Sequence, residues 1–188
     1  MHREHRFPLN CIGNMDETSL SFDLPYSTTL EARGAKTVNI RTTGHERSCF
    51  TVILACLADG TKLEPTVIFK LKNIPRETFP EGVHVRVNEK GWCNGTEMLY
   101  WINNVWSEHN SFGNPNSLLV LDSFRGHTLD SVIEEFTDKQ THLAVIPGGL
   151  TSKLQPLDVA INKGFKEKVS VLSKIVCLIL LNILTFNL

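Results

Sequence analysis

The amino-acid sequence predicts an α/β domain whose mixed sheet combines an antiparallel hairpin with parallel strands, flanked by helices. In the first half, runs of β-branched and apolar residues are separated by Asp59-Gly60, a strong hairpin-turn signal. In the second half, short apolar runs alternate with segments of helical period, which is typical of strand–helix–strand crossovers. With 188 residues, 41% apolar and 21% charged, the chain can bury the core of one such domain.

The first half contains three predicted strands. Leu9–Met15 is short and largely apolar and leads into two carboxylates, so we expect a strand that ends at Asp16 and Glu17. Ser48–Leu57 and Leu63–Phe69 are rich in β-branched and apolar residues, and the turn between them predicts an antiparallel pair. The polar stretch between the first and second strands is expected to be a loop.

The second half alternates helices and strands. Residues of helical period predict a helix over Asn94–His109 and a shorter amphipathic helix over Leu129–Phe136. Between them, the continuous apolar run Ser117–Leu121 predicts a strand that is buried on both faces and ends at a carboxylate. His142–Ile146 is expected to form another short buried strand, and a further helix should begin at Leu157.

We expect three segments along the chain: a lead-in at residues 1–10, one domain at 11–168 and an apolar tail at 169–188. The tail has three interpretations, namely a helix packed on the domain, a non-native end or a tail anchor. Because its uninterrupted apolar run is too short to span a bilayer, no membrane association is expected. The N-terminus has no apolar signal core, so secretion is not expected.

Cysteine content and net charge limit the classes of function. The 5 cysteines are odd in number and form no CxxC pair, so free thiols in a reducing compartment are expected. A formal net charge of −1 lacks the basic excess of an autonomous DNA-binding module. Divalent cations can offset a local acidic cluster, so a charge near zero does not exclude phosphate chemistry.

Three aspartates share a context that favours metal chemistry. Asp16 and Asp122 follow predicted strands, and Asp158 opens a predicted helix, which are the places where sites in α/β sheets collect. Clustered carboxylates repel one another, and a hard cation such as Mg²⁺ relieves that repulsion while leaving positions open for phosphate. Two such ions would support phosphodiester hydrolysis or strand transfer. Taken singly, each aspartate is more simply interpreted as a cap.

The short sequence motifs around these acids resemble those of a known family. Gly13–Thr18 (GNMDET) resembles the first acidic block of pogo/Tigger-type DDE transposases. Leu119–His127 (LVLDSFRGH) looks like the second block, an apolar strand followed by Asp and then Gly-His. Pro147–Asp158 (PGGLTSKLQPLD) is similar to the third, and the spacing of the last two acids suits this lineage.

The resemblance implies a ribonuclease-H-like fold and DNA cleavage and strand transfer in the nucleus. It implies that Asp16, Asp122 and Asp158 are catalytic and hold Mg²⁺ or Mn²⁺, with DNA as partner and a homodimer as the assembly. Relatives of the jerky-like and centromere-binding type keep the domain for DNA binding or regulation, so a non-enzymatic DNA- or chromatin-associated module is the alternative function. A degenerate fragment is the third hypothesis, since no helix-turn-helix modules precede the first strand and the hydrophobic tail follows Lys168.

Other residues near the acids have competing interpretations. His127 either contacts phosphate or orients a carboxylate, or it is a loop or helix-cap histidine. Arg125 and Lys153 flank the second and third acids and are expected to contact a phosphate backbone or to be surface charges. Glu17 is expected to be a hydrogen-bonding partner rather than a metal ligand. The three tryptophans are expected in the core and at its rim, because base stacking would need a groove.

Overall fold

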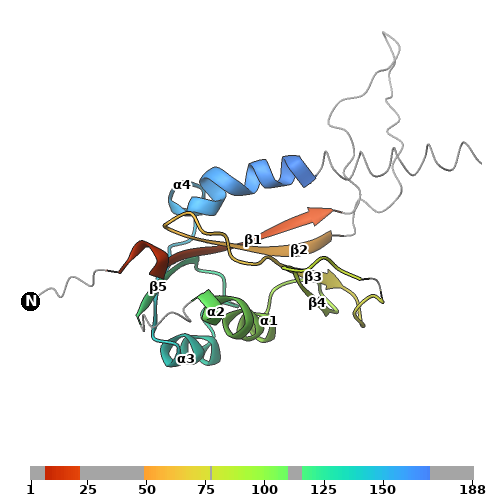
Figure 1. Ribbon diagram of the computed structural model, residues 1–188, viewed down its shortest axis with the longest axis horizontal. Helices are drawn as coiled ribbons and strands as arrows, with labels where there is room; N and C mark the ends of the chain where they lie inside the picture. Colours follow the sequence, from red (N-terminus) through yellow and green to blue (C-terminus); the bar gives the residue numbers. More distant parts are fainter. Residues whose placement is uncertain (1–6, 22–48, 77, 110–115, 170–188) are drawn as a thin grey trace, which may run out of the picture.

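A six-stranded mixed sheet forms the centre of the computed structural model, which describes residues 7–21, 49–76, 78–109 and 116–169 (Figure 1). The strand order is β4-β3-β2-β1-β5-β6. Pairing is antiparallel between β1 and β2 and between β2 and β3, and parallel in the other three pairs. The strands are β1 (Ile12–Ser21), β2 (Cys49–Leu57), β3 (Thr66–Lys70), β4 (His84–Asn88), β5 (Ser117–Asp122) and β6 (Thr141–Ile146).

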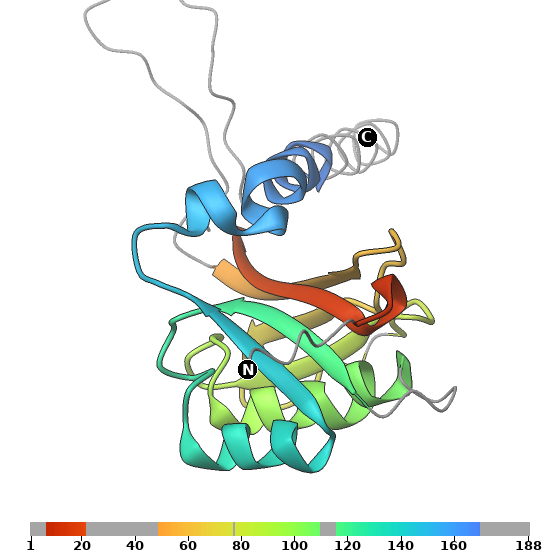
Figure 2. The same ribbon diagram turned by 90° about the vertical axis from the view of Figure 1, so that its left-hand side faces the viewer.

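Helices cover both faces of the sheet. A short 3-10 turn, η1 (Leu9–Cys11), precedes β1. The other helical segments are α1 (Gly95–Trp101), η2 (Ile102–Trp106), α2 (Ser107–His109), α3 (Asp130–Asp138), α4 (Thr151–Leu154) and η3 (Leu157–Ile161). Residues 162–169 continue η3 as α-helix, and we call 157–169 the C-terminal helix. The segments η2 and η3 have π-helical hydrogen bonding. Figure 2 shows α1 and α3 against one face, with the C-terminal helix across the other.

The core lies between the sheet and the α1–α3 layer. Along β5, Leu119 and Leu121 point into it, because alternate residues of a strand face the same side. Gly13 of β1 faces the same side, where a Cβ atom would lie 2.4 Å from the Trp106 ring. Trp106 is buried and its Nε1 donates a hydrogen bond to Thr141 Oγ1 at 2.8 Å, which ties the helical layer to β6.

The turn predicted between the first two strands of the hairpin is confirmed. Gly60 has a φ of 93°, a left-handed conformation that glycine adopts without a steric cost, and Leu57 N donates to Thr61 O at 2.8 Å. The following strand begins at Thr66, three residues later than predicted. The predicted helices and strands of the second half are present with shifts at their ends.

Two predictions about strands were wrong, and one strand was missed. The first strand does not end at Asp16, because β1 continues to Ser21 while it pairs with β2 along its whole length. The strand β4 was not predicted, since its alternation of polar residues with valine is weak without the partner β3. The strand β5 is not fully buried on both faces, because Leu118, Val120 and Asp122 are only partly buried.

The structure tests two further expectations within the residues that it describes. Within residues 7–21, 49–76, 78–109 and 116–169, the four cysteines are free thiols, as expected. In that same part of the chain, no helix is long and apolar enough to cross a membrane. The apolar tail beyond residue 169 and the predicted loop at residues 22–48 lie outside the described residues.

Candidate active site

Asp16 and Asp158 meet on the face of the sheet that the C-terminal helix covers. Asp16 points to this face because its neighbour Met15 points into the core. The amide of Asn162 joins the two acids: its Nδ2 donates to Asp16 Oδ2 and lies 3.2 Å from Asp158 Oδ1. Since Asn162 follows Asp158 by one helical turn, both side chains lie on the same side of η3.

Burial and a neighbouring carboxylate together change the proton affinity of Asp16. The side chain is nearly inaccessible to solvent, and the loss of hydration raises the pKa of the Asp16 carboxyl to about 7, with Asp158 adding to the rise. Asp158 itself is exposed. Asp16 therefore takes up a proton near neutral pH, beside an Asp158 carboxylate that is open to solvent.

Polar residues of the first and third acidic blocks, Gly13–Thr18 and Pro147–Asp158, hold the C-terminal helix on the sheet. Asn14 Oδ1 accepts a hydrogen bond from the backbone N–H of Leu157 at 3.0 Å, and Asn14 Nδ2 donates to Val120 O at 2.9 Å. Gln155, which is fully buried, donates through Nε2 to Met15 O at 3.1 Å. These bonds connect β1, β5 and η3, so they place Asp158 relative to Asp16.

Asp122, the last residue of β5, lies on the same face as Asp16. The parallel pairing of β1 with β5 ends at Asn14 and Val120, and two residues further along each strand come Asp16 and Asp122. Asp122 Oδ1 accepts a hydrogen bond from the backbone N–H of Phe124 at 3.0 Å. Asp122 is thus adjacent to Asp16 in the sheet, but its carboxylate already accepts a hydrogen bond from its own loop.

His127 bridges two acidic side chains where β1 and β5 are no longer paired. Its Nδ1 lies 2.8 Å from Asp122 Oδ1, and its Nε2 lies 2.8 Å from Glu17 Oε1. Burial lowers the pKa of His127, but the contacts with Asp122 and Glu17 outweigh it and raise the pKa to about 9. The close contact with His127 in turn lowers the pKa of Asp122. A charged imidazolium therefore holds Asp122 ionised and oriented.

These contacts bear on the other predicted site residues. His127 is 2% exposed with both ring nitrogens against carboxylates, which favours the carboxylate-orienting interpretation over a phosphate contact. Glu17 is a hydrogen-bonding partner, as expected. Arg125 and Lys153 are both exposed, so both interpretations, phosphate contact and surface charge, stay open.

The donor atoms suit a hard divalent cation, although the site is not closed around one. Among the residues that the structure describes, no three His, Cys, Asp or Glu side chains are close enough together to form a metal site as they stand. Asp16 and Asp158 nevertheless converge on one amide, so the groups that the described contacts bring together are two carboxylates and the Asn162 side chain. This oxygen-rich set fits Mg²⁺ or Mn²⁺ better than a soft metal.

Sequence reasoning missed Asn162 and the two-sided role of His127. The signal for Asn162 was its position four residues after Asp158 in a predicted helix, which places the two side chains together. No local signal links His127 to Glu17, because the two residues are 110 positions apart.

Comparison with known sequences gives one family. The sequence model of a family described as DDE superfamily endonuclease matches residues 47–174. This range includes Asp122 and Asp158, and Asp16 precedes it.

Two human proteins are similar over most of the chain. The chain is 36% identical over 170 residues to "Pogo transposable element with KRAB domain", which covers 90% of the chain and 28% of that protein. It is 31% identical over 160 residues to "Pogo transposable element with ZNF domain", covering 85% of the chain and 11% of that protein. The chain therefore spans less than a third of the length of these relatives.

Solved structures share the fold. The structure titled "Mos1 transposase paired-end complex with left transposon end" has a TM-score of 0.58 at 10% identity and covers 86% of this chain and 42% of that chain. "Crystal structure of a pre-cleavage Mos1 transpososome" has a TM-score of 0.55 at 12% identity, covering 85% and 43% respectively. The six-stranded mixed sheet is thus the ribonuclease-H-like fold that the sequence resemblance implied.

Proposed function

Because this chain belongs to the DDE superfamily endonuclease family, and forms a transposase-derived domain of the pogo type, we propose that it cleaves DNA phosphodiester bonds with a divalent cation. The observation that supports this most is the convergence of Asp16 and Asp158 on the amide of Asn162, with Asp122 on the adjacent strand of the same face. This placement of acids that are far apart in sequence supports a shared cation site.

Asp16, Asp122 and Asp158 would hold the Mg²⁺ or Mn²⁺. When bound, such an ion supplies Lewis acidity and activates water for attack on phosphorus. Its positive charge would also displace the proton from Asp16, whose pKa is raised by burial and by Asp158. Asn162 keeps the two acids together, and the contact with His127 favours the ionised form of Asp122.

We also propose the wider setting of this chemistry. DNA is the substrate, strand transfer follows cleavage, and the domain acts in the nucleus, as suits a relative of pogo transposable elements. The Mos1 structure that shares the fold is a paired-end complex with a transposon end, which supports DNA ends as substrate and a homodimer as the assembly. Arg125 and Lys153 would contact the phosphate backbone beside the acids.

Metal titration combined with plasmid nicking tests the proposal. Isothermal titration calorimetry should show Mg²⁺ or Mn²⁺ binding that is lost in Asp16→Asn, Asp122→Asn and Asp158→Asn. Nicking of supercoiled plasmid should be lost in the same variants. Asp138→Asn, at the exposed end of α3, is the matched control and should retain both. Nicking that survives the removal of all three acids contradicts the assignment.

A non-enzymatic DNA- or chromatin-associated module is the second candidate. One observation favours it: the Asp122 carboxylate is already held by His127 and by the Phe124 amide, so it is less free to bind metal. In this case the chain binds DNA, but neither binding nor plasmid integrity depends on Mg²⁺. Domestication of the domain would then have kept the fold and lost the reaction.

A further inference from the structure

We propose that a pocket beside the acids, built around Trp92 and Phe124, binds one unpaired nucleotide of the DNA. This inference rests on the proposed DNA-cleaving function and specifies which form of DNA the site takes. The pocket has a volume of about 260 Å³, and its walls include Lys90, Trp92, Phe124, Arg125 and Leu129. It belongs to none of the contacts that hold Asp16 and Asp158 together.

The aromatic side chains that line this pocket are exposed to solvent. Trp92 is 68% exposed, whereas the other two tryptophans, Trp101 and Trp106, are buried in the core. Phe124 is 43% exposed and lines the same pocket as Trp92. An exposed cluster of large apolar side chains lowers solubility without contributing to the core, so it indicates a binding surface.

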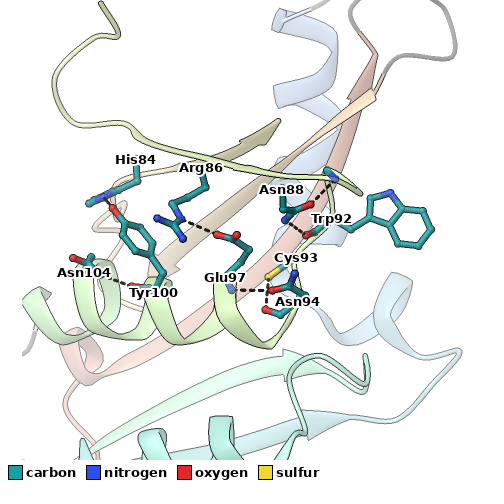
Figure 3. A network of polar contacts seen from close by, with 10 residues as sticks. His84, Arg86, Asn88, Trp92, Cys93, Asn94, Glu97, Tyr100 and Asn104 are labelled. Carbon is teal, nitrogen blue, oxygen red and sulfur yellow. Dashed lines mark hydrogen bonds and ion pairs between the residues drawn. The ribbon is translucent and has the colours of Figure 1, made fainter. Parts of the chain in front are cut away.

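A network of hydrogen bonds fixes the turn that carries Trp92 (Figure 3). Asn88 Oδ1 accepts from the backbone N–H of Gly91 at 2.6 Å, and Asn88 Nδ2 donates to Trp92 O at 2.8 Å. Gly91 has a φ of 69°, and a Cβ there would lie 2.8 Å from the Lys70 side chain. Asn94 then caps α1 by accepting from Glu97 N at 3.1 Å. Trp92 therefore projects from a rigid turn, as Figure 3 shows, and little ordering is needed on binding.

The pocket adjoins the candidate active site. Phe124 follows Asp122 by two residues and its backbone N–H donates to that carboxylate at 3.0 Å. The Phe124 ring meets the His127 ring edge-on, with centroids 5.4 Å apart. Cys93 lines the pocket, and burial together with the neighbouring Glu17 carboxylate raises the pKa of its thiol. A DNA backbone that passes Asp122 would thus place an adjacent nucleotide at the mouth of the pocket, where Arg125 can meet its phosphate.

Charge and shape identify the occupant. Lys90 and Arg125 line the pocket, and no acidic residue is among the described residues of its walls, so it suits a ligand with phosphates. Aromatic side chains bind bases by stacking, which needs a free base face. In a duplex both faces of a base are covered by its neighbours, so only an unpaired or displaced nucleotide can enter.

Fluorescence binding measurements with the whole chain in EDTA test the proposal without cleavage. The probes are a labelled single strand, a blunt duplex of the same sequence, and that duplex with one bulged nucleotide. Trp92→Ala should weaken binding of the single strand and the bulged duplex about tenfold or more, and leave the blunt duplex unchanged. Trp92→Phe should restore the affinity while removing the quenching of tryptophan fluorescence by DNA, because Trp92 is the exposed tryptophan.

Leu9→Ala is the matched control, since Leu9 is 60% exposed and precedes β1 at the end of the sheet opposite to Asp122. It should bind all three probes as the unchanged chain does. If Trp92→Ala binds the unpaired probes as tightly as the unchanged chain, or weakens all three probes equally, the nucleotide pocket is refuted while the proposed function stands. If the unchanged chain binds none of the probes, the proposed function fails as well.

Discussion

Replacing Asp16 by Asn should stabilise the metal-free domain at neutral pH, although Asp16 is one of the acids proposed for catalysis. Asp16 is 7% exposed, and the exposed Asp158 carboxylate lies close enough to share the amide of Asn162 with it. An ionised Asp16 therefore loses hydration and meets a like charge. Asn removes the charge and keeps an oxygen that accepts the hydrogen bond from Asn162.

The magnitude follows from the pKa of Asp16. Folding raises this pKa from 3.8 to about 7, so the folded state holds a proton that the unfolded chain has released. The associated stability is complete below the unfolded pKa of 3.8 and is lost as the pH rises through about 7. At about 1.4 kcal/mol for each pKa unit, the ceiling near pH 8 is about 4 kcal/mol. Because Asn carries its own burial cost, we expect a gain of about 1–3 kcal/mol.

Urea unfolding in EDTA measures this gain. The increase in the free energy of unfolding should be largest near about pH 8, smaller near about pH 5 and absent near about pH 3. Adding Mg²⁺ should stabilise the unchanged chain and have less effect on Asp16→Asn, because the cation relieves the same repulsion. Asp138→Asn, at an exposed position, should change little at any pH. A variant that is less stable than the unchanged chain at about pH 8, or a gain that is independent of pH, refutes the reasoning.

Four further predictions follow from single contacts. Asp122→Asn should abolish plasmid nicking with an unchanged circular dichroism spectrum, and persistent nicking would contradict its role. Asn14→Ala removes two hydrogen bonds that join β1 to β5 and η3, so urea unfolding should show a loss of about 2 kcal/mol. The charged form of His127 stabilises the fold fully below its unfolded pKa of 6.5, and this stability is lost as the pH rises through about 9. In His127→Gln, the free energy of unfolding should therefore change less with pH between 6.5 and about 9. Gly13→Ala places a Cβ 2.4 Å from the Trp106 ring and should lower the thermal midpoint, whereas an unchanged midpoint would mean that the ring can shift.

The fold class could be predicted because its signals are local. The Asp59-Gly60 turn and the apolar run of β5 act through neighbouring residues, and both are found where the sequence placed them. The ends of strands depend on partners that are distant in sequence. Pairing with β2 extends β1 past Asp16 to Ser21, and β4 is a strand only because β3 lies beside it.

The candidate site likewise combines residues that the sequence predicted with contacts that depend on the fold. The three sequence motifs predicted Asp16, Asp122 and Asp158 from residue identity and order. The structure brings Asp16 and Asp158 together through Asn162. The engagement of Asp122 by His127, and the link from His127 to Glu17, could not be predicted, since the contact joins residues 110 positions apart. The pocket at Trp92 likewise needs the loop after β5 to lie against the turn before α1.

The sequence by itself determined the family and the α/β class and predicted the three acids, because turn chemistry, hydrophobic period and short motifs are properties of short segments. Only the tertiary structure decided that Asp16 is buried against Asp158 with a pKa of about 7, and that Asp122 is held by His127. The physical reason is that burial and the distance between charges, which set proton and metal affinity, exist only once β1, β5 and the C-terminal helix are packed together.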